Sequence, residues 1–389
     1  MTAWEILFWV LFGVIFYAYV GYGALLQLLQ FFKRPAKLQT MEALPPVTLL
    51  IASYNEASIL PQKIANCLAL DYPSEKLTVL VVTDGSTDGS PTLLKDFPGV
   101  QIFHESTRRG KTAAINRAME TVTSPIVIFS DANALLNRNC LKKLVRHFQN
   151  PKVGAVAGEK KVAFASGMGS AEGWYWKYES FMKRLDASFY TVVGAAGELF
   201  AMRQSLFSPP PEDTLLDDFA LSMQVCLQGF IIAYEPDAFA TEAPSASLYN
   251  EQQRKMRIAA GAFQSLKRLS WSRLFSIPSL AFQFLSRRWL RWVVCPAGLV
   301  LLFVTNAFLA VYSTSFFYEA LFALHLLFYG LAGIGWWLIR RNKAFALVTV
   351  PFYFLFMNYC ILAGYFQFLN GTHTVLWRKA ERMDSGLSK

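Results

Sequence analysis

Four long uncharged stretches constrain this chain more than any other feature of its sequence. They cover residues 6–32, 292–318, 320–339 and the first two-thirds of 344–377. About 20 apolar residues in a helix span the ~30 Å hydrocarbon core of a bilayer. The composition agrees, because 54% of the 389 residues are hydrophobic and only 16% are charged, unlike an ordinary soluble domain. We therefore expect part of the chain to lie in lipid.

Between the first and second stretches lie residues that carry nearly all the carboxylates. A segment of about 260 residues is long enough for one large globular domain with its own core. The sequence therefore predicts four parts: an N-terminal membrane anchor at 1–36, a globular domain at 45–270, an interfacial helix at 275–291, and a membrane bundle of about three helices at 292–377.

The first stretch lacks a basic start, is too long, and has no small-residue cleavage site after it, so we expect an uncleaved anchor and not a signal peptide. Lys33, Arg34 and Lys37 follow it, and residues 340–343 form a basic loop. Basic loops favour the cytoplasmic side. The prediction is an integral protein of the plasma (inner) membrane with a cytoplasmic globular domain; the side of the C-terminal tail stays open.

Charge and cysteine content exclude several classes of protein. The formal net charge is +10, which in a membrane protein is better explained by basic residues facing anionic lipid than by nucleic acid. The five cysteines lie far apart, without a C-x-x-C pair, so neither a disulfide framework nor a zinc site is expected.

Residues 278–291 mix aromatic and aliphatic side chains with Arg287, Arg288 and Arg291. This pattern is typical of a helix in the membrane interface, with rings at headgroup level and guanidinium groups in water. The alternative is a plain cytoplasmic lead-in to the next span.

Alternating short runs predict the architecture of the globular domain. Runs rich in β-branched residues alternate with amphipathic stretches; the runs are 47–53, 77–83, 100–103 and 126–130, and the stretches are 57–70, 90–96 and 111–122. This alternation is typical of βαβ units, with a parallel sheet covered by helices on both faces. Ligands of such sheets bind beyond the carboxyl ends of the strands.

Three polar clusters follow these strands, at residues 53–56, 84–89 and 131–133, and together they favour a nucleotide-type site. In the second cluster the glycines allow a tight turn close to a ligand, and Asp84 can accept hydrogen bonds from a base or ribose. The alternative is a loop that merely caps the next helix.

Asp131 and Asn133 come directly after a buried strand. Two oxygen-bearing side chains there could face a divalent cation together with a diphosphate, since Mg²⁺ and Mn²⁺ prefer oxygen ligands. Alternatively, one of them caps the helix expected near Asn137.

Asp217 and Asp218 are adjacent carboxylates in an apolar context ahead of a predicted helix. Burial and a second acid raise the proton affinity of a carboxylate, which suits a general base. Alternatively, both acids simply interact with the helix dipole. The basic residues at 252–257 and 108–111 could hold a diphosphate or lie on the membrane surface.

An ordered set of motifs resembles the family 2 glycosyltransferases, the membrane-embedded inverting enzymes that include cellulose, hyaluronan, chitin-oligosaccharide and poly-N-acetylglucosamine synthases. The resemblance covers about residues 45–265. Its motifs are A-S-Y-N-E at 52–56, D-G-S-T-D-G at 84–89, R-R-G-K-T-A-A-I-N at 108–116, S-D-A-N at 130–133, G-A-A-G-E-L-F at 194–200 and L-D-D-F-A-L at 216–221.

The resemblance implies a GT-A fold, with a Rossmann-like α/β nucleotide-binding sheet, that binds a nucleoside-diphosphate sugar, most often a UDP-sugar. It implies Asp218 as the catalytic base and Asp131, with Asn133, as ligands of Mg²⁺ or Mn²⁺. The nucleotide-sugar site would include Ala52, Tyr54, Glu56, Asp84, Lys111 and Asp131, and the acceptor and diphosphate site Asp217, Arg254, Arg257, Gly194 and Gly197.

Three positions depart from the family pattern. Thr83 precedes Asp84 where many members have an acid, Asn133 replaces the second acid of the D-x-D motif, and residues 254–258 lack the Gln and Trp of the processive Q-x-x-R-W motif. The sequence therefore predicts sugar transfer to a glycan acceptor in polysaccharide synthesis, with a single transfer to a lipid acceptor as the alternative. It indicates a bilayer partner and no nucleic acid, and assigns neither the sugar nor any partner subunit.

Overall fold

A computed structural model describes residues 1–31, 41, 43–163, 168–372 and 374–376. The basic residues Lys33, Arg34 and Lys37 and the tail from residue 377 onward lie outside the described residues.

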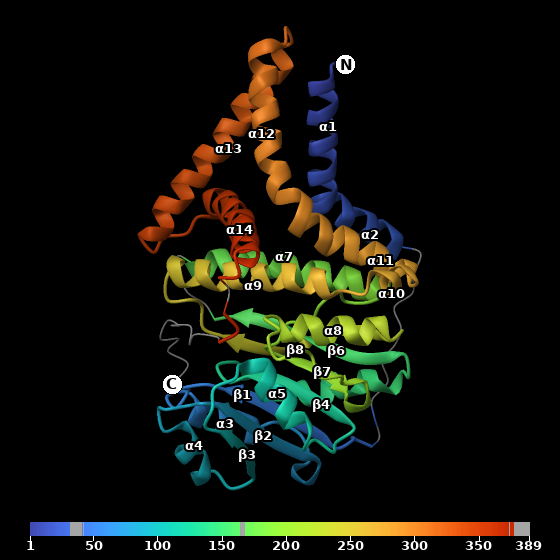
Figure 1. The fold of residues 1–389 in the computed structure, drawn as a ribbon, viewed down its shortest axis with the longest axis vertical. Coiled ribbons are helices and arrows are strands. Elements are labelled where there is room, and N and C mark those ends of the chain that lie inside the picture. The colour runs from blue at the N-terminus through green and yellow to red at the C-terminus, as the bar shows by residue number, and fades with distance from the viewer. Residues whose placement is uncertain (32–40, 42, 164–167, 373, 377–389) are drawn as a thin grey trace.

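The described chain is arranged in three tiers (Figure 1): an α/β domain at the base, a layer formed by α7, α9 and α11, and helices that rise from this layer. The helices are α1 (Ala3–Phe16), α2 (Tyr22–Gln30), α3 (Leu60–Leu68), α4 (Ser90–Leu93), α5 (Lys111–Met119), α6 (Cys140–Val145), α7 (Met168–Phe189), α8 (Asp217–Leu227), α9 (Leu248–Arg268), α10 (Trp271–Phe275), α11 (Pro278–Phe284), α12 (Cys295–Tyr312), α13 (Phe316–Arg340) and α14 (Ala346–Leu369).

In the part of the chain that the structure describes, eight strands form one sheet in the order β3-β2-β1-β4-β7-β6-β8-β5. Their bounds are β1 (Val47–Ser53), β2 (Leu77–Asp84), β3 (Val100–Glu105), β4 (Ile126–Asp131), β5 (Leu135–Leu136), β6 (Val153–Val162), β7 (Phe200–Arg203) and β8 (Ile231–Glu242). The four predicted strands are present and parallel, with bounds within two residues of those expected.

The sheet is mixed and not wholly parallel as expected, because β7 runs antiparallel to both β4 and β6. An antiparallel neighbour needs no crossover helix, so a strand of only four residues can enter the middle of the sheet. Phe200, the first residue of β7, pairs with Phe129 near the end of β4. This register brings the loop before β7 to the sheet edge where Asp131 lies.

Apolar side chains cover both faces of the sheet, as the sequence predicts. One cluster joins β1, β2 and β4 to α5 and α8 through residues such as Leu50, Ala114 and Leu221. The other joins the opposite face to α3 and α6. Every residue of β1 is buried, which explains its continuous apolar run without polar alternation.

Within the described residues, four helical segments are long and apolar enough to cross a membrane: Ala3–Gln30, Pro278–Tyr312, Phe316–Arg340 and Ala346–Leu369. The predicted second stretch extends too far, since its helix ends at Tyr312 and the polar residues 313–315 turn the chain into α13. The predicted interfacial residues are continuous with this span. α11 lies in the middle tier and the chain then bends upward into α12 (Figure 1), with a π-helical segment, Leu285–Val294, at the bend.

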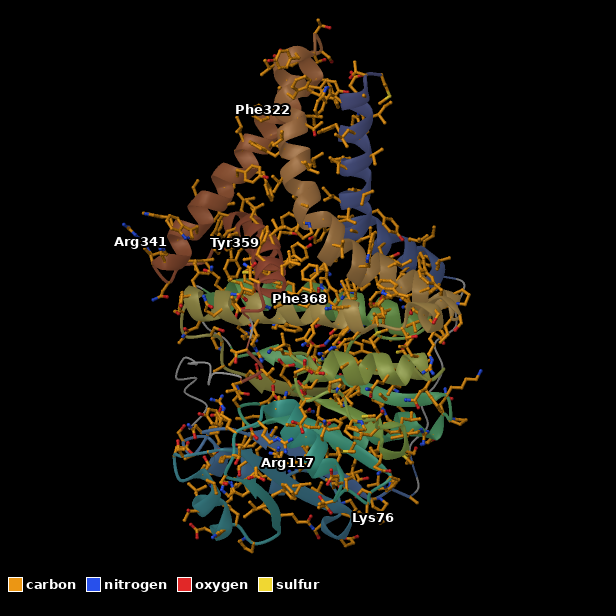
Figure 2. All side chains as sticks on the ribbon, in the orientation of Figure 1. Lys76, Arg117, Phe322, Arg341, Tyr359 and Phe368 are labelled. Atoms are coloured by element: carbon orange, nitrogen blue, oxygen red, sulfur yellow. The ribbon has the colours of Figure 1, made fainter. Side chains whose placement is uncertain are left out.

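The lower end of α14 packs against α9. Figure 2 shows Phe368 at the lower end of α14, and its ring centroid lies 6.4 Å from that of Phe263 in α9. The two helices approach most closely at Gly364. A Cβ atom added there would lie 2.5 Å from the Cβ of Ala259 and 2.6 Å from the carbonyl oxygen of Met256. Only glycine fits this crossing.

We expect Gly364→Ala to destabilise the protein by about 1 to 3 kcal/mol, because the added methyl group forces α14 away from α9. Thermal unfolding of the detergent-purified protein measures the change as a lower Tm. Gly333→Ala in α13 is the matched control, since a Cβ there meets nothing within 4 Å. Equal Tm values for Gly364→Ala and the wild type would contradict the tight crossing.

Candidate active site

One cavity of about 1550 Å³ extends from the sheet edge to the membrane helices. Its wall includes every predicted site residue except Asp84: Ala52, Tyr54, Glu56, Lys111, Asp131, Asn133, Gly194, Gly197, Asp217, Asp218, Arg254 and Arg257. Residues that are remote in the sequence thus meet in one space.

Three element ends place the charged groups of this cavity. β4 ends at Asp131, α5 begins at Lys111, and α8 begins with Asp217. Gly110, with φ of +108°, turns the chain into α5. The two aspartates lie in the first turn of α8, where the partial positive charge of the helix terminus favours carboxylates. The preference for carboxylates in the first turn of a helix is therefore consistent with the position of both aspartates in this cavity.

Lys111 bridges the acids of β4 and α8. Its Nζ lies 2.9 Å from Oδ1 of Asp131 and 3.3 Å from Oδ2 of Asp217. Burial disfavours the ammonium ion, but the nearby carboxylates of Asp131, Asp217 and Asp218 hold the pKa of Lys111 above its ordinary value. The lysine therefore stays charged and neutralises part of the acidic cluster.

Asp218 combines a raised proton affinity with a fixed orientation. Its Oδ2 accepts a hydrogen bond of 2.9 Å from the backbone N–H of Gly197, and its Oδ1 accepts one of 2.7 Å from that of Phe219. Burial, together with the adjacent charge of Asp217, raises the pKa of Asp218 to about 7 although Lys111 opposes the shift. A carboxylate with a pKa near neutrality suits general base catalysis.

Asp84 lies outside the cavity wall. Its fully buried carboxylate accepts hydrogen bonds from the N–H groups of Arg109 (3.1 Å) and Gly110 (2.7 Å) and pairs with Arg117 at 3.0 Å. Figure 2 labels Arg117 within the α/β domain. In this arrangement Asp84 fixes the loop that precedes Lys111, and the nucleotide contact of Asp84 stays a prediction.

The two arginines of α9 that line the cavity differ in how their charge is compensated. Arg254 pairs with Glu172 at 2.6 Å and with Glu251 at 2.9 Å. For Arg257, no carboxylate of the described residues lies within the 4.0 Å of an ion pair, and burial lowers the pKa of its guanidinium. Arg257 is therefore the better candidate to bind an incoming anion.

The oxygen donors around Asp131 are suited to a divalent cation. Carboxylate oxygens of Asp131, Glu198 and Glu242 all lie within 4.8 Å of one another. Lys160 pairs with both glutamates and Lys111 pairs with Asp131. Asp131, Asn133 and Glu198 line the cavity. Hard cations such as Mg²⁺ take a small number of such protein oxygens and complete their shell with phosphate and water, so the donor chemistry fits.

A buried lysine that was not predicted as a site residue lies behind these donors. Lys63 of α3 is fully buried, and its Nζ donates hydrogen bonds to Oγ of Ser130 (2.8 Å) and to the carbonyl oxygen of Ala134. It thereby holds both ends of the turn that carries Asp131 and Asn133. The sequence signal that could have identified Lys63 is its position on the apolar side of a short amphipathic helix, where a lysine needs a buried partner.

The part of the cavity between α1, α12, α13 and α14 is mostly apolar. Polar side chains there bond to one another: Asn306 to His325 at 3.0 Å, and Tyr19 to Asn358 at 2.8 Å. The apolar lining includes Phe8, Phe12, Leu302, Leu321, Phe328 and Phe354. The cavity therefore has charged side chains at the sheet edge and a mainly apolar lining between the membrane helices, where lipid chains could bind.

Comparison with known proteins supports these observations. Residues 48–208 match the family described as Glycosyl transferase family 2. A β-monoglucosyldiacylglycerol synthase of Nostoc sp. is 30% identical over 214 residues, which is 50% of this chain and 45% of the relative. A poly-β-1,6-N-acetyl-D-glucosamine synthase of Staphylococcus aureus is 26% identical over 244 residues, 59% of this chain and 57% of the relative. The chain thus spans about half the length of these relatives.

A solved structure resembles almost the whole fold. A mannosyltransferase from Pyrobaculum calidifontis, in complex with GDP-Man and Mn²⁺, superposes with a TM-score of 0.73 at 22% identity, over 94% of this chain and 99% of that one. The predicted GT-A fold is therefore confirmed.

Proposed function

Because residues 48–208 form a glycosyl transferase family 2 domain, we propose that this chain transfers a sugar from a nucleoside-diphosphate sugar to an acceptor held at the membrane. One observation carries the proposal: Asp131, Lys111 and Asp218 line the same cavity, and that cavity continues between helices long enough to span a bilayer. The catalytic domain faces the cytoplasm and the chain lies in the inner membrane.

In the proposed reaction Asp218 takes the proton of an acceptor hydroxyl. The acceptor oxygen forms a bond to the anomeric carbon from the face opposite the diphosphate, so the configuration inverts. The bond from that carbon to the diphosphate breaks, and its electron pair leaves with the nucleoside diphosphate. Lys111 and Arg257 offset the charge that develops on this leaving group.

Asp131, with the amide oxygen of Asn133, is the proposed site of a divalent cation, Mg²⁺ or Mn²⁺. The Pyrobaculum protein, which was solved with Mn²⁺, supports this assignment. When bound, the cation adds positive charge beside the departing diphosphate. The contribution of the chain is to supply oxygen donors and to hold them on the rigid end of β4.

The apolar lining between the membrane helices favours a lipid acceptor over a growing glycan, because a sugar chain would need hydrogen-bond partners along its path. The absence of the Gln and Trp from residues 254–258 agrees. Polysaccharide synthesis is the second candidate, and the relative from Staphylococcus aureus, a polysaccharide synthase by name, supports it.

Incubation of the detergent-purified chain with a panel of UDP- and GDP-sugars, Mg²⁺ or Mn²⁺, and membrane lipid tests the proposal. We expect release of nucleoside diphosphate from one donor, with UDP-sugars proposed first, and a product one sugar heavier than the lipid. A ladder of sugars would assign the second candidate. No release from any donor would refute the function.

A further inference from the structure

Arg288 and Lys183 are two of the cations that line the cavity and are not assigned to the proposed diphosphate site. Arg288, half-buried at the π-helical bend, donates a hydrogen bond from Nε to the carbonyl oxygen of Val193 at 2.8 Å. A Cβ atom at Gly194 would lie 3.2 Å from Nη2 of Arg288. Lys183 of α7 lines the same cavity. Arg288 therefore lies beside Gly194, which the family resemblance assigns to the acceptor site.

The charge of Arg288 is uncompensated, in contrast to its neighbours. Arg287 pairs with Glu179 at 2.8 Å and with Asp186 at 3.0 Å, and Arg291 pairs with Glu179 at 3.0 Å. No carboxylate among the described residues lies within the 4.0 Å of an ion pair with Arg288. Its guanidinium therefore keeps donors that can bind an anion in the cavity.

The ammonium group of Lys183 has even fewer hydrogen-bond partners than the guanidinium of Arg288. The side chain is only 3% exposed, and its ammonium group has no hydrogen-bond partner within the described residues. The rings of Trp176 and Tyr234 lie 5.5 and 6.0 Å away. Burial, with the charge of Arg288 adding to the effect, lowers the pKa of Lys183 although three glutamates oppose the shift. Burying an ammonium group without a partner is costly, so a bound anion would stabilise this arrangement.

The distance to the proposed base is short. Gly194 beside Arg288 belongs to the loop between α7 and β7, and Gly197 of the same loop donates a hydrogen bond to Asp218. Three residues span at most roughly 10 Å. One small headgroup could thus reach both the base and Arg288, and the charge of Arg288 is close enough to contribute to the lowered pKa of Lys183. Trp292 and Leu299, which follow Arg288 in the chain toward α12, also line the cavity.

Resting on the proposed function, we infer that the acceptor is an anionic phospholipid with a free headgroup hydroxyl. Its phosphate binds Lys183 and Arg288, its hydroxyl reaches Asp218, and its hydrocarbon chains lie between α1, α12, α13 and α14. The hydroxyl proton passes to Asp218, the oxygen bonds to the anomeric carbon, and the nucleoside diphosphate leaves. The phosphate of the acceptor stays intact, so the product is a glycosylated phospholipid.

The test compares two acceptors with the full-length protein in phosphatidylcholine vesicles that contain equal amounts of phosphatidylglycerol or diacylglycerol. We expect kcat/KM to be at least tenfold higher for phosphatidylglycerol. Glycerol 3-phosphate, which has the phosphate and hydroxyls but no chains, should be a poor acceptor. Equal use of the two lipids, or preference for diacylglycerol, would overturn the inference while leaving the glycosyltransferase function in place.

Arg288→Gln and Lys183→Met should each lower the ratio of the two kcat/KM values by about tenfold or more, since a charge-assisted hydrogen bond to phosphate is lost. Arg273→Gln is the matched control, because Arg273 is an exposed residue of α10 outside the cavity wall. Native mass spectrometry supplies a readout without turnover: both variants should retain less phosphatidylglycerol than Arg273→Gln does. Equal retention in all three would refute the phosphate site. Nucleoside diphosphate release without acceptor tests the underlying function separately.

Discussion

Asp218→Asn is expected to lower kcat by about a thousandfold or more, within the range of roughly 10² to 10⁴ for the loss of a general base. The amide keeps the shape of the side chain and can still accept a hydrogen bond, so the contact with the N–H of Gly197 can persist. The change removes the proton acceptor and little else. Initial rates of nucleoside diphosphate release with saturating donor and lipid acceptor measure the effect.

The pH dependence of the wild-type rate is a second test of Asp218 as the base. Asp218 acts as a base only when ionised, and its pKa is about 7, so the rate should rise with pH through about 7 and then level off. The folded state holds the proton more tightly than the unfolded state, because the pKa of Asp218 is raised. Its ionisation therefore lowers stability as pH rises toward 7. Asp218→Asn should melt no lower than the wild type at pH 8.

Asp217→Asn is the matched control for this prediction. The charge of Asp217 is one cause of the raised pKa of Asp218, so its removal should move the midpoint of the pH profile to a lower value. Nucleotide affinity of Asp218→Asn should stay near that of the wild type. A loss of nucleotide binding, or a variant that remains active, would contradict the assignment of Asp218 as the base.

The sequence predicted the strands that a local pattern can specify. β1 is buried on both faces and β4 is buried up to its last residue, and each appears as a compact run of β-branched residues. β7 has four residues, and its place depends on pairing with residues more than 40 positions away in the chain. No local periodicity encodes such a pairing, so the mixed character of the sheet could not be derived.

The residues of the candidate site likewise fall into those that the sequence predicted and those that it did not. Ordered motifs predicted the residues at strand and helix ends, and the structure brings all of them except Asp84 to one cavity wall. Lys183 and Arg288 were not predicted as site residues. What distinguishes them is that no carboxylate of the described residues forms an ion pair with either one, and a sequence pattern does not show this. Arg287 and Arg288 are adjacent in the chain, yet Arg287 finds Glu179 across 108 residues and Arg288 does not. Only tertiary contacts separate a structural arginine from a ligand-binding one.

Asp131→Ala is expected to remove the metal dependence of nucleotide binding and to lower kcat on the order of 10²-fold, as the loss of a charge-stabilising group does. Wild-type protein should bind UDP, or the nucleotide of the active donor, at least tenfold more tightly with Mn²⁺ than with EDTA. In the variant this ratio should approach one. Isothermal titration with each additive measures it. Asn133→Ala, which removes a neutral ligand, should reduce the ratio less.

The ion pair of Lys111 gives this prediction an internal control. Asp131 holds the ammonium group of Lys111 at 2.9 Å, so its removal frees part of that positive charge for the diphosphate. In EDTA the variant should therefore bind nucleotide as tightly as the wild type, or more tightly, whereas in Mn²⁺ it should bind more weakly. A misfolded site would weaken binding under both conditions. Opposite effects in the two conditions can arise only if Asp131 serves the cation and not the nucleotide directly.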